Sequence, residues 1–219
     1  KVIEYVDKAL SGNGDNFIVS NTGSTSANGN FFGPLRANLA SYRQTRMIVG
    51  LLDGTYFTGT TGAVIDPRIS TMVTPSADNV YRGTIPGFSD PGTVALKNQI
   101  PNPWGVLASA NPGAGFGKYL FKDNVGFPIM TYSEMQFIKA EAAFREGDLA
   151  VAYAAYLNGI TSSIDFVSTL GTAITTTQKN TYMTSAAVKQ SASALTLRDI
   201  MLQKYLALYG YGFVETWCD

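Results

Sequence analysis

The sequence predicts a mainly α protein, with tetratricopeptide-like helical hairpins and a loop-rich, irregular subdomain that contains short strands. Residues 130–160 have the pattern of two helices joined by a short turn, and residues 195–217 repeat apolar side chains at helical spacing. Residues 55–125, by contrast, contain Gly or Pro every few positions and keep neither a helical nor a strand period. The fold class follows from these observations.

The N-terminal part is predicted to be helical. "KVIEYVDKAL" places Val2 and Val6 near one face of a first helix, and a loop rich in Gly, Asn, Ser and Thr follows. A second helix of roughly 15 to 20 residues is expected between Phe31 and Gly54, because apolar residues recur there at approximate helical spacing. Residues 1–54 are therefore assigned to an N-terminal tetratricopeptide-like region with a truncated start, since helical periodicity begins without a cap or leader.

Residues 55–127 are predicted to be an irregular, ligand-binding region, because their aromatic content exceeds that of a disordered linker and long loops in compact domains are usually functional. Trp104, between Pro and Gly in "NPWG", is the first candidate for a partly exposed ring that stacks on a sugar. The alternative is that Trp104 fills a small core inside this region. Tyr81 and Tyr119 are further candidates for ligand contact.

The hairpin is the clearest element. In "MTYSEMQFIKAEAAFREGDLAVAYAAYLNGI", Thr131 and Glu134 fit a capping box, Gly147 ends the first helix, and Asp148 caps the second. Two antiparallel helices with small residues at their contact form the tetratricopeptide pattern. The residues expected to face inward or to allow close approach are Met135, Ile138, Ala140, Ala142 and Ala143.

Two further helices are expected before the end of the chain. "TTTQKNTYMTSAAVKQ" indicates a short one, and residues 195–217 a long one, capped by Ser193 or Thr196 and bent at Gly210 and Gly212. Residues 128–219 are therefore assigned to tetratricopeptide-like helices with a truncated end. The lone cysteine near this end excludes an intramolecular disulfide and is interpreted as a small hydrophobic residue on the helix.

Composition excludes several function classes. Sixteen basic and sixteen acidic residues balance, so no net field favours nucleic acid, and no run reaches the roughly 18 apolar residues of a transmembrane helix. The absence of histidine excludes Ser-His and Cys-His catalysis, and with one cysteine it disfavours zinc. The glycine-rich stretches "GNGDN" and "GAGFGK" both lack phosphate-loop spacing. No cofactor or metal is therefore expected. Abundant neutral polar and aromatic residues suit neutral ligands such as sugars.

Two-carboxylate glycoside hydrolysis is the enzyme alternative, because it needs only Asp or Glu side chains at close range. Asp66, Asp78, Asp90 and Asp123 lie in the irregular region. Their contexts, such as "IDPR" and "SDPG", are also typical of turns and helix caps, where aspartate bonds to its own backbone. We therefore expect no enzyme activity.

The hairpin sequence "FPIMTYSEMQFIKAEAAFREGDLAVAYAAYLNGI" resembles the helix pair that marks the SusD/RagB family. "IDPRIS" with "YRGTIPG" is similar to the DPR and Y-x-G elements of that family, and "IMLQKYLALYGYGFVETWCD" to its Q-K-[WY]-x-A-L helix. The matching hairpin residues are Pro128, Met130, Thr131, Tyr132, Glu134, Lys139, Ala140, Glu141, Ala142, Gly147, Ala150, Tyr156 and Ile160.

The resemblance implies a cell-surface lipoprotein of the outer membrane in Bacteroidetes-type bacteria, without catalysis. Members of this family capture glycans, or peptides in some cases, and pass them to a SusC-like TonB-dependent transporter. The helices would face the transporter, and the ligand would meet the irregular region. The lipid-anchor cysteine and N-terminal helices of the family are not in this chain, which fits an internal piece of a longer protein. A purely structural tetratricopeptide-like adaptor is the third hypothesis.

Overall fold

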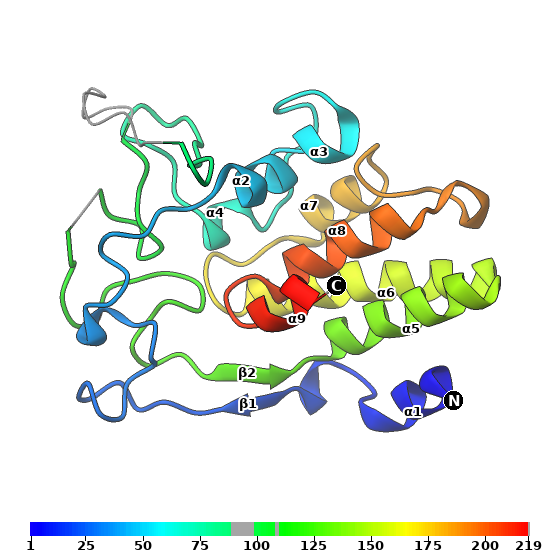
Figure 1. Ribbon diagram of the computed structural model, residues 1–219, viewed down its shortest axis with the longest axis horizontal. Helices are drawn as coiled ribbons and strands as arrows, with labels where there is room; N and C mark the ends of the chain where they lie inside the picture. Colours follow the sequence, from blue (N-terminus) through cyan, green and yellow to red (C-terminus); the bar gives the residue numbers. More distant parts are fainter. Residues whose placement is uncertain (89–98, 108–109, 219) are drawn as a thin grey trace.

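The computed structural model describes residues 1–88, 99–107 and 110–218. It confirms the mainly α fold class: most helices lie at one end of the molecule, and irregular segments gather at the other (Figure 1). No helix within the described residues is both long and apolar enough to cross a membrane. The helices are α1 (Val2–Ala9), α2 (Arg46–Leu52), α3 (Thr55–Thr58), α4 (Ile69–Met72), α5 (Tyr132–Glu146), α6 (Leu149–Ser168), α7 (Thr176–Met183), α8 (Leu197–Leu208) and α9 (Phe213–Cys218).

The strands are short. β1 (Phe17–Val19) pairs antiparallel with β2 (Phe127–Met130), and Ile18 faces Pro128 in the register. The pairing holds the N-terminal segment against β2, which leads directly into α5 (Figure 1).

The predicted hairpin is confirmed as α5 and α6. The Thr131 hydroxyl accepts from the Glu134 amide at 3.2 Å, and Gly147 ends α5 in the left-handed conformation, with φ 84°. Asp148 caps α6 by accepting from the Val151 amide. Side-chain capping at each start satisfies amides that have no partner inside the helix.

Small residues let the two helices approach closely. Ala140 and Ala143 are fully buried, as predicted, and Gly159 on α6 packs against the Phe137 ring on α5. The buried face of α5 differs from the prediction, because Ile138 and Ala142 are only half-buried while Phe137 is fully buried. The reason is that α5 packs against α1, α6 and α8 at once, which a single inward stripe does not describe.

The helix predicted between Phe31 and Gly54 is wrong over its first half. Residues 34–36 form one 3-10 turn, and regular helix begins only at α2, where the Thr45 hydroxyl accepts from the Ile48 amide. The cause is tertiary, because the Asp123 carboxylate accepts from the Leu35 amide at 2.8 Å. The side-chain amide of Asn30 donates to the Leu120 carbonyl at 2.6 Å and fixes the chain just before this turn.

The long C-terminal helix is interrupted rather than bent. α8 begins with a complete capping box between Thr196 and Asp199, which selects Thr196 over Ser193 as the cap. It ends at Leu208, Gly210 takes a φ of 93°, and α9 follows as a separate helix. A glycine in this left-handed region lets the chain turn without steric cost.

Candidate ligand-binding site

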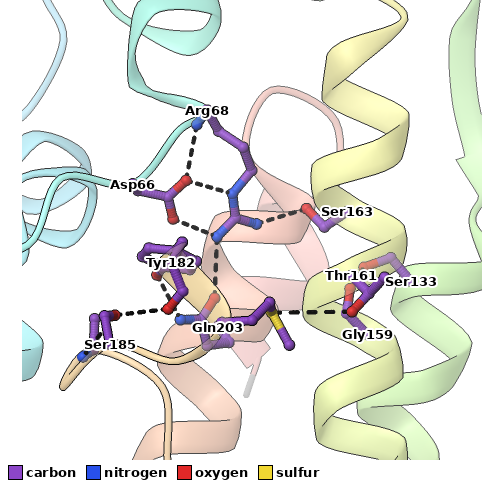
Figure 2. A network of polar contacts seen from close by, with 11 residues as sticks. Asp66, Arg68, Ser133, Gly159, Thr161, Ser163, Tyr182, Ser185 and Gln203 are labelled. Carbon is purple, nitrogen blue, oxygen red and sulfur yellow. Dashed lines mark hydrogen bonds and ion pairs between the residues drawn. The ribbon is translucent and has the colours of Figure 1, made fainter. Parts of the chain in front are cut away.

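The most buried polar feature is an ion pair between Asp66 and Arg68, both fully buried (Figure 2). Arg68 Nε donates to Asp66 Oδ1 at 2.9 Å, and Nη2 donates to Oδ2 at 2.6 Å. Burial disfavours the guanidinium charge, but the charge and hydrogen bonds of Asp66 outweigh it and hold the pKa of Arg68 above its ordinary value.

Further hydrogen bonds extend this pair to three helices (Figure 2). Arg68 donates to the Ser163 hydroxyl on α6 at 2.7 Å and to the Gln203 side-chain oxygen on α8 at 3.1 Å. The Gln203 amide nitrogen then donates to the Tyr182 hydroxyl on α7 at 3.0 Å. The pair therefore holds the segment before α4 against the helical part of the molecule.

The aspartates considered for hydrolysis are engaged in structural contacts. Both oxygens of Asp66 bind Arg68, and both oxygens of Asp123 accept backbone amides, from Leu35 and Gly115. The exposed Asp78 pairs with Arg82, and hydrogen bonds from Arg82 lower the pKa of Asp78 to about 2. The fourth aspartate, Asp90, lies outside the described residues. Within the described part of the chain, no group of three or more acidic or cysteine side chains could hold a metal ion.

Trp104 does not have the exposed face that the sequence predicts. Its side chain is 3% exposed and lies in the core with residues of α2 and α8. The indole N–H donates to the Phe32 carbonyl at 2.7 Å, so the polar edge of the ring is satisfied inside the protein. The alternative prediction of a buried ring is therefore correct. Trp104 fills a core, and this core extends beyond the irregular region to α2 and α8.

Tyr119 is also buried, at 1% exposure, and stacks on Tyr209 with ring centroids 6.1 Å apart. Burial raises the pKa of its phenol well above the ordinary value. Tyr81 is half-buried against the core, and burial raises its pKa as well. The structure does not bring Tyr81, Trp104 and Tyr119 together around a shared cavity, and of the three only Tyr81 keeps part of its surface exposed.

A cavity of about 260 Å³, here called the aromatic pocket, lies between the 32–43 segment and the C-terminal helices. Tyr42 and Phe213 at its rim are 63% and 59% exposed. Phe213 packs edge-to-face on Phe32, with ring centroids 6.2 Å apart. Its aromatic lining consists of Phe32, Tyr42, Phe121, Tyr205, Tyr209 and Phe213. The arrangement offers exposed ring faces beside a hollow, which suits stacking on an apolar or sugar ring.

This pocket was not predicted from the sequence. Tyr205 and Tyr209 are four residues apart in the predicted 195–217 helix, so their position on one face was detectable in the sequence. Tyr42 lies in the first half of the predicted 31–54 helix, which does not form, because Asn30 and Leu35 bond to residues 120 and 123 instead. Only the structure brings it to Phe213.

Comparison with known proteins identifies a family and a similar fold. A family model described as SusD-like, starch-binding and associating with the outer membrane matches residues 5–219. Among solved structures, a SusD homolog from Bacteroides fragilis is similar in fold, with a TM-score of 0.67 and 20% sequence identity. The match covers 95% of this chain but 45% of that homolog, so the chain spans less than half of its length. No curated protein matches the sequence.

Proposed function

The chain belongs to the SusD-like family, and on this premise we propose that it binds a glycan at the bacterial cell surface and delivers it to a SusC-like, TonB-dependent transporter. The observation that carries the proposal is the family match, which extends from residue 5 to residue 219. In this proposal a lipid anchor holds the whole protein on the outer membrane, and the protein performs no catalysis.

The aromatic pocket supports this function and suggests where the glycan binds. Sugar rings present flat C–H faces that pack on aromatic side chains, and Tyr42 and Phe213 expose such faces at the pocket rim. Hydrolysis lacks comparable support, because Asp66 and Asp123 are buried and occupied by other donors. Tyr81 remains a candidate contact outside the pocket.

Calorimetric titration of the complete protein with maltoheptaose and other neutral oligosaccharides tests the proposal. Tyr42→Ala and Phe213→Ala should each weaken binding about tenfold, since one aromatic contact contributes about 1–1.5 kcal/mol. Tyr5→Ala is the control, because Tyr5 is 67% exposed on α1 and does not line the pocket. A wild-type protein that binds no oligosaccharide would contradict the proposed function.

The structural adaptor remains the second candidate, because one observation favours it. Trp104 was the first candidate ligand contact, and its burial removes that argument for a binding surface. An adaptor would bind no glycan, and its affinity for a partner would be insensitive to substitutions at Tyr42 and Phe213. The same titrations therefore separate the two hypotheses.

A further inference from the structure

A second cavity, of about 660 Å³, lies between residues 63–70 and α7. We call it the polar cavity. Its volume falls in the range of about 300–1,000 Å³ typical of small-molecule sites. It shares no lining residue with the aromatic pocket.

The base of the polar cavity is held by hydrogen bonds and carries no net charge. Asp66 and Tyr182 line it, and both are almost fully buried. The negative charge of Asp66 is matched by Arg68, whose guanidinium contacts both carboxylate oxygens. Gln203 holds the Tyr182 hydroxyl from the side of α8 (Figure 2). A ligand with a net charge would find no unmatched partner at this base.

The walls carry hydroxyl and amide groups that are available to a ligand. Within the described residues, the hydroxyls of Ser70, Thr177 and Thr181 make no hydrogen bond, and all three residues are exposed. The Gln178 side-chain oxygen accepts from the Thr175 amide and hydroxyl, which leaves its NH₂ group as the free end. The hydroxyls can both donate and accept, and the NH₂ group donates, so together they can pair with the hydroxyls of a sugar.

Apolar surface completes the lining. Ile65 is 52% exposed, and Pro67 and Ile69 lie beside it along the same segment. A sugar ring has one hydroxyl-bearing edge and apolar C–H faces, so it needs this combination of neutral polar groups and aliphatic contact. Charged lipids and phosphates need cationic side chains, and no Lys or Arg lines the polar cavity among the described residues.

We propose that the polar cavity is a second binding site for a neutral oligosaccharide, separate from the aromatic pocket, with Thr177, Gln178 and Thr181 as its polar contacts. The inference rests on the proposed function, and it adds a location and a ligand class that the family match does not supply.

Thr181→Trp in the complete protein tests the inference by filling the cavity. Titration with maltoheptaose, cellohexaose and xylohexaose should show at least tenfold weaker binding of the oligosaccharide that the wild type prefers. Thr176→Trp is the matched control, because Thr176 is exposed on the same helix and does not line the cavity. Its affinity should stay within twofold of wild type.

A milder variant keeps the test valid if the tryptophan disturbs folding. Thr181→Val preserves shape and removes the hydroxyl, and it should weaken binding about three- to tenfold, in line with the loss of one hydrogen bond. If the wild type binds a neutral oligosaccharide and both Thr181 variants bind it equally well, the polar cavity is not a site while the proposed function stands. If the wild type binds none of the three, both fail.

Discussion

The indole N–H of Trp104 donates to the carbonyl oxygen of Phe32 across 2.7 Å, and Phe32 lines the aromatic pocket. Trp104, the first sequence-predicted candidate for ligand contact, therefore does not line the pocket itself but bonds to the backbone of Phe32, which does. Its contribution is to the shape of the pocket, through the 32–43 segment, rather than to its surface.

Trp104→Ala should destabilise the protein strongly. Removing a buried tryptophan leaves a cavity, which typically costs about 3–5 kcal/mol, and it also leaves the Phe32 carbonyl without its donor. Urea denaturation followed by circular dichroism measures this change. A loss below about 1 kcal/mol would show that Trp104 is not packed as described.

Asp66→Asn should also be strongly destabilising, because it leaves the buried Arg68 charge without its counterion. Breaking such a pair by removing one partner typically costs about 3–5 kcal/mol. Asp78→Asn is the matched control, since Asp78 pairs with Arg82 at the surface, and it should change stability far less. Equal midpoints of urea unfolding for the two variants would contradict the role assigned to the buried pair.

Gly159→Ala should destabilise the hairpin even though alanine favours helices. An added Cβ would lie 2.8–3.0 Å from three ring atoms of Phe137, which is fully buried and cannot move aside easily. Overpacking of this kind costs about 1–3 kcal/mol, more than the gain of about 1 kcal/mol in helix propensity. Asn158→Ala, at the exposed neighbouring position, should be neutral or slightly stabilising in the same denaturation experiment.

Lys118 should make stability rise with pH above neutrality. Its ammonium donates to Ser70 O, Val73 O and Thr74 Oγ1 at 2.7–2.9 Å, and burial lowers its pKa to about 8 from the ordinary 10.5. Between these values the unfolded chain holds a proton that the folded chain has released. The free energy of unfolding therefore increases as pH rises through this window.

Urea unfolding at pH 7.5, 8.5 and 9.5 measures this effect, with Lys118→Met as the comparison. The wild type should gain stability relative to the variant as pH rises. Parallel curves would mean that the pKa of Lys118 is not lowered in the folded protein.

The sequence was sufficient where structure is determined locally. Thr131, Gly147 and Asp148 fix the ends of α5 and α6 through side-chain caps and a left-handed glycine, and these signals lie within a few residues of one another. The same holds for Thr196 at the start of α8. Helix ends of this kind need no knowledge of the rest of the fold.

The sequence was insufficient where distant segments decide the backbone. The apolar spacing after Phe31 is helical, yet contacts of Asn30 and Leu35 with residues 120–123 hold that stretch in turns. The expected exposure of Trp104 was wrong for a related reason, because its ring packs in a core with residues of α2 and α8 and its N–H donates to the Phe32 carbonyl, 72 residues away in sequence. Periodicity and turn chemistry do not report such partners.

One comparison tests the central claim most directly: calorimetric titration of the complete protein with its preferred neutral oligosaccharide, for the wild type, Tyr42→Ala and Trp104→Phe. Trp104→Phe keeps most of the buried ring volume, so we predict an affinity within about threefold of wild type, whereas Tyr42→Ala should bind about tenfold more weakly. Normal binding by Tyr42→Ala together with lost binding by a folded Trp104→Phe would contradict the account.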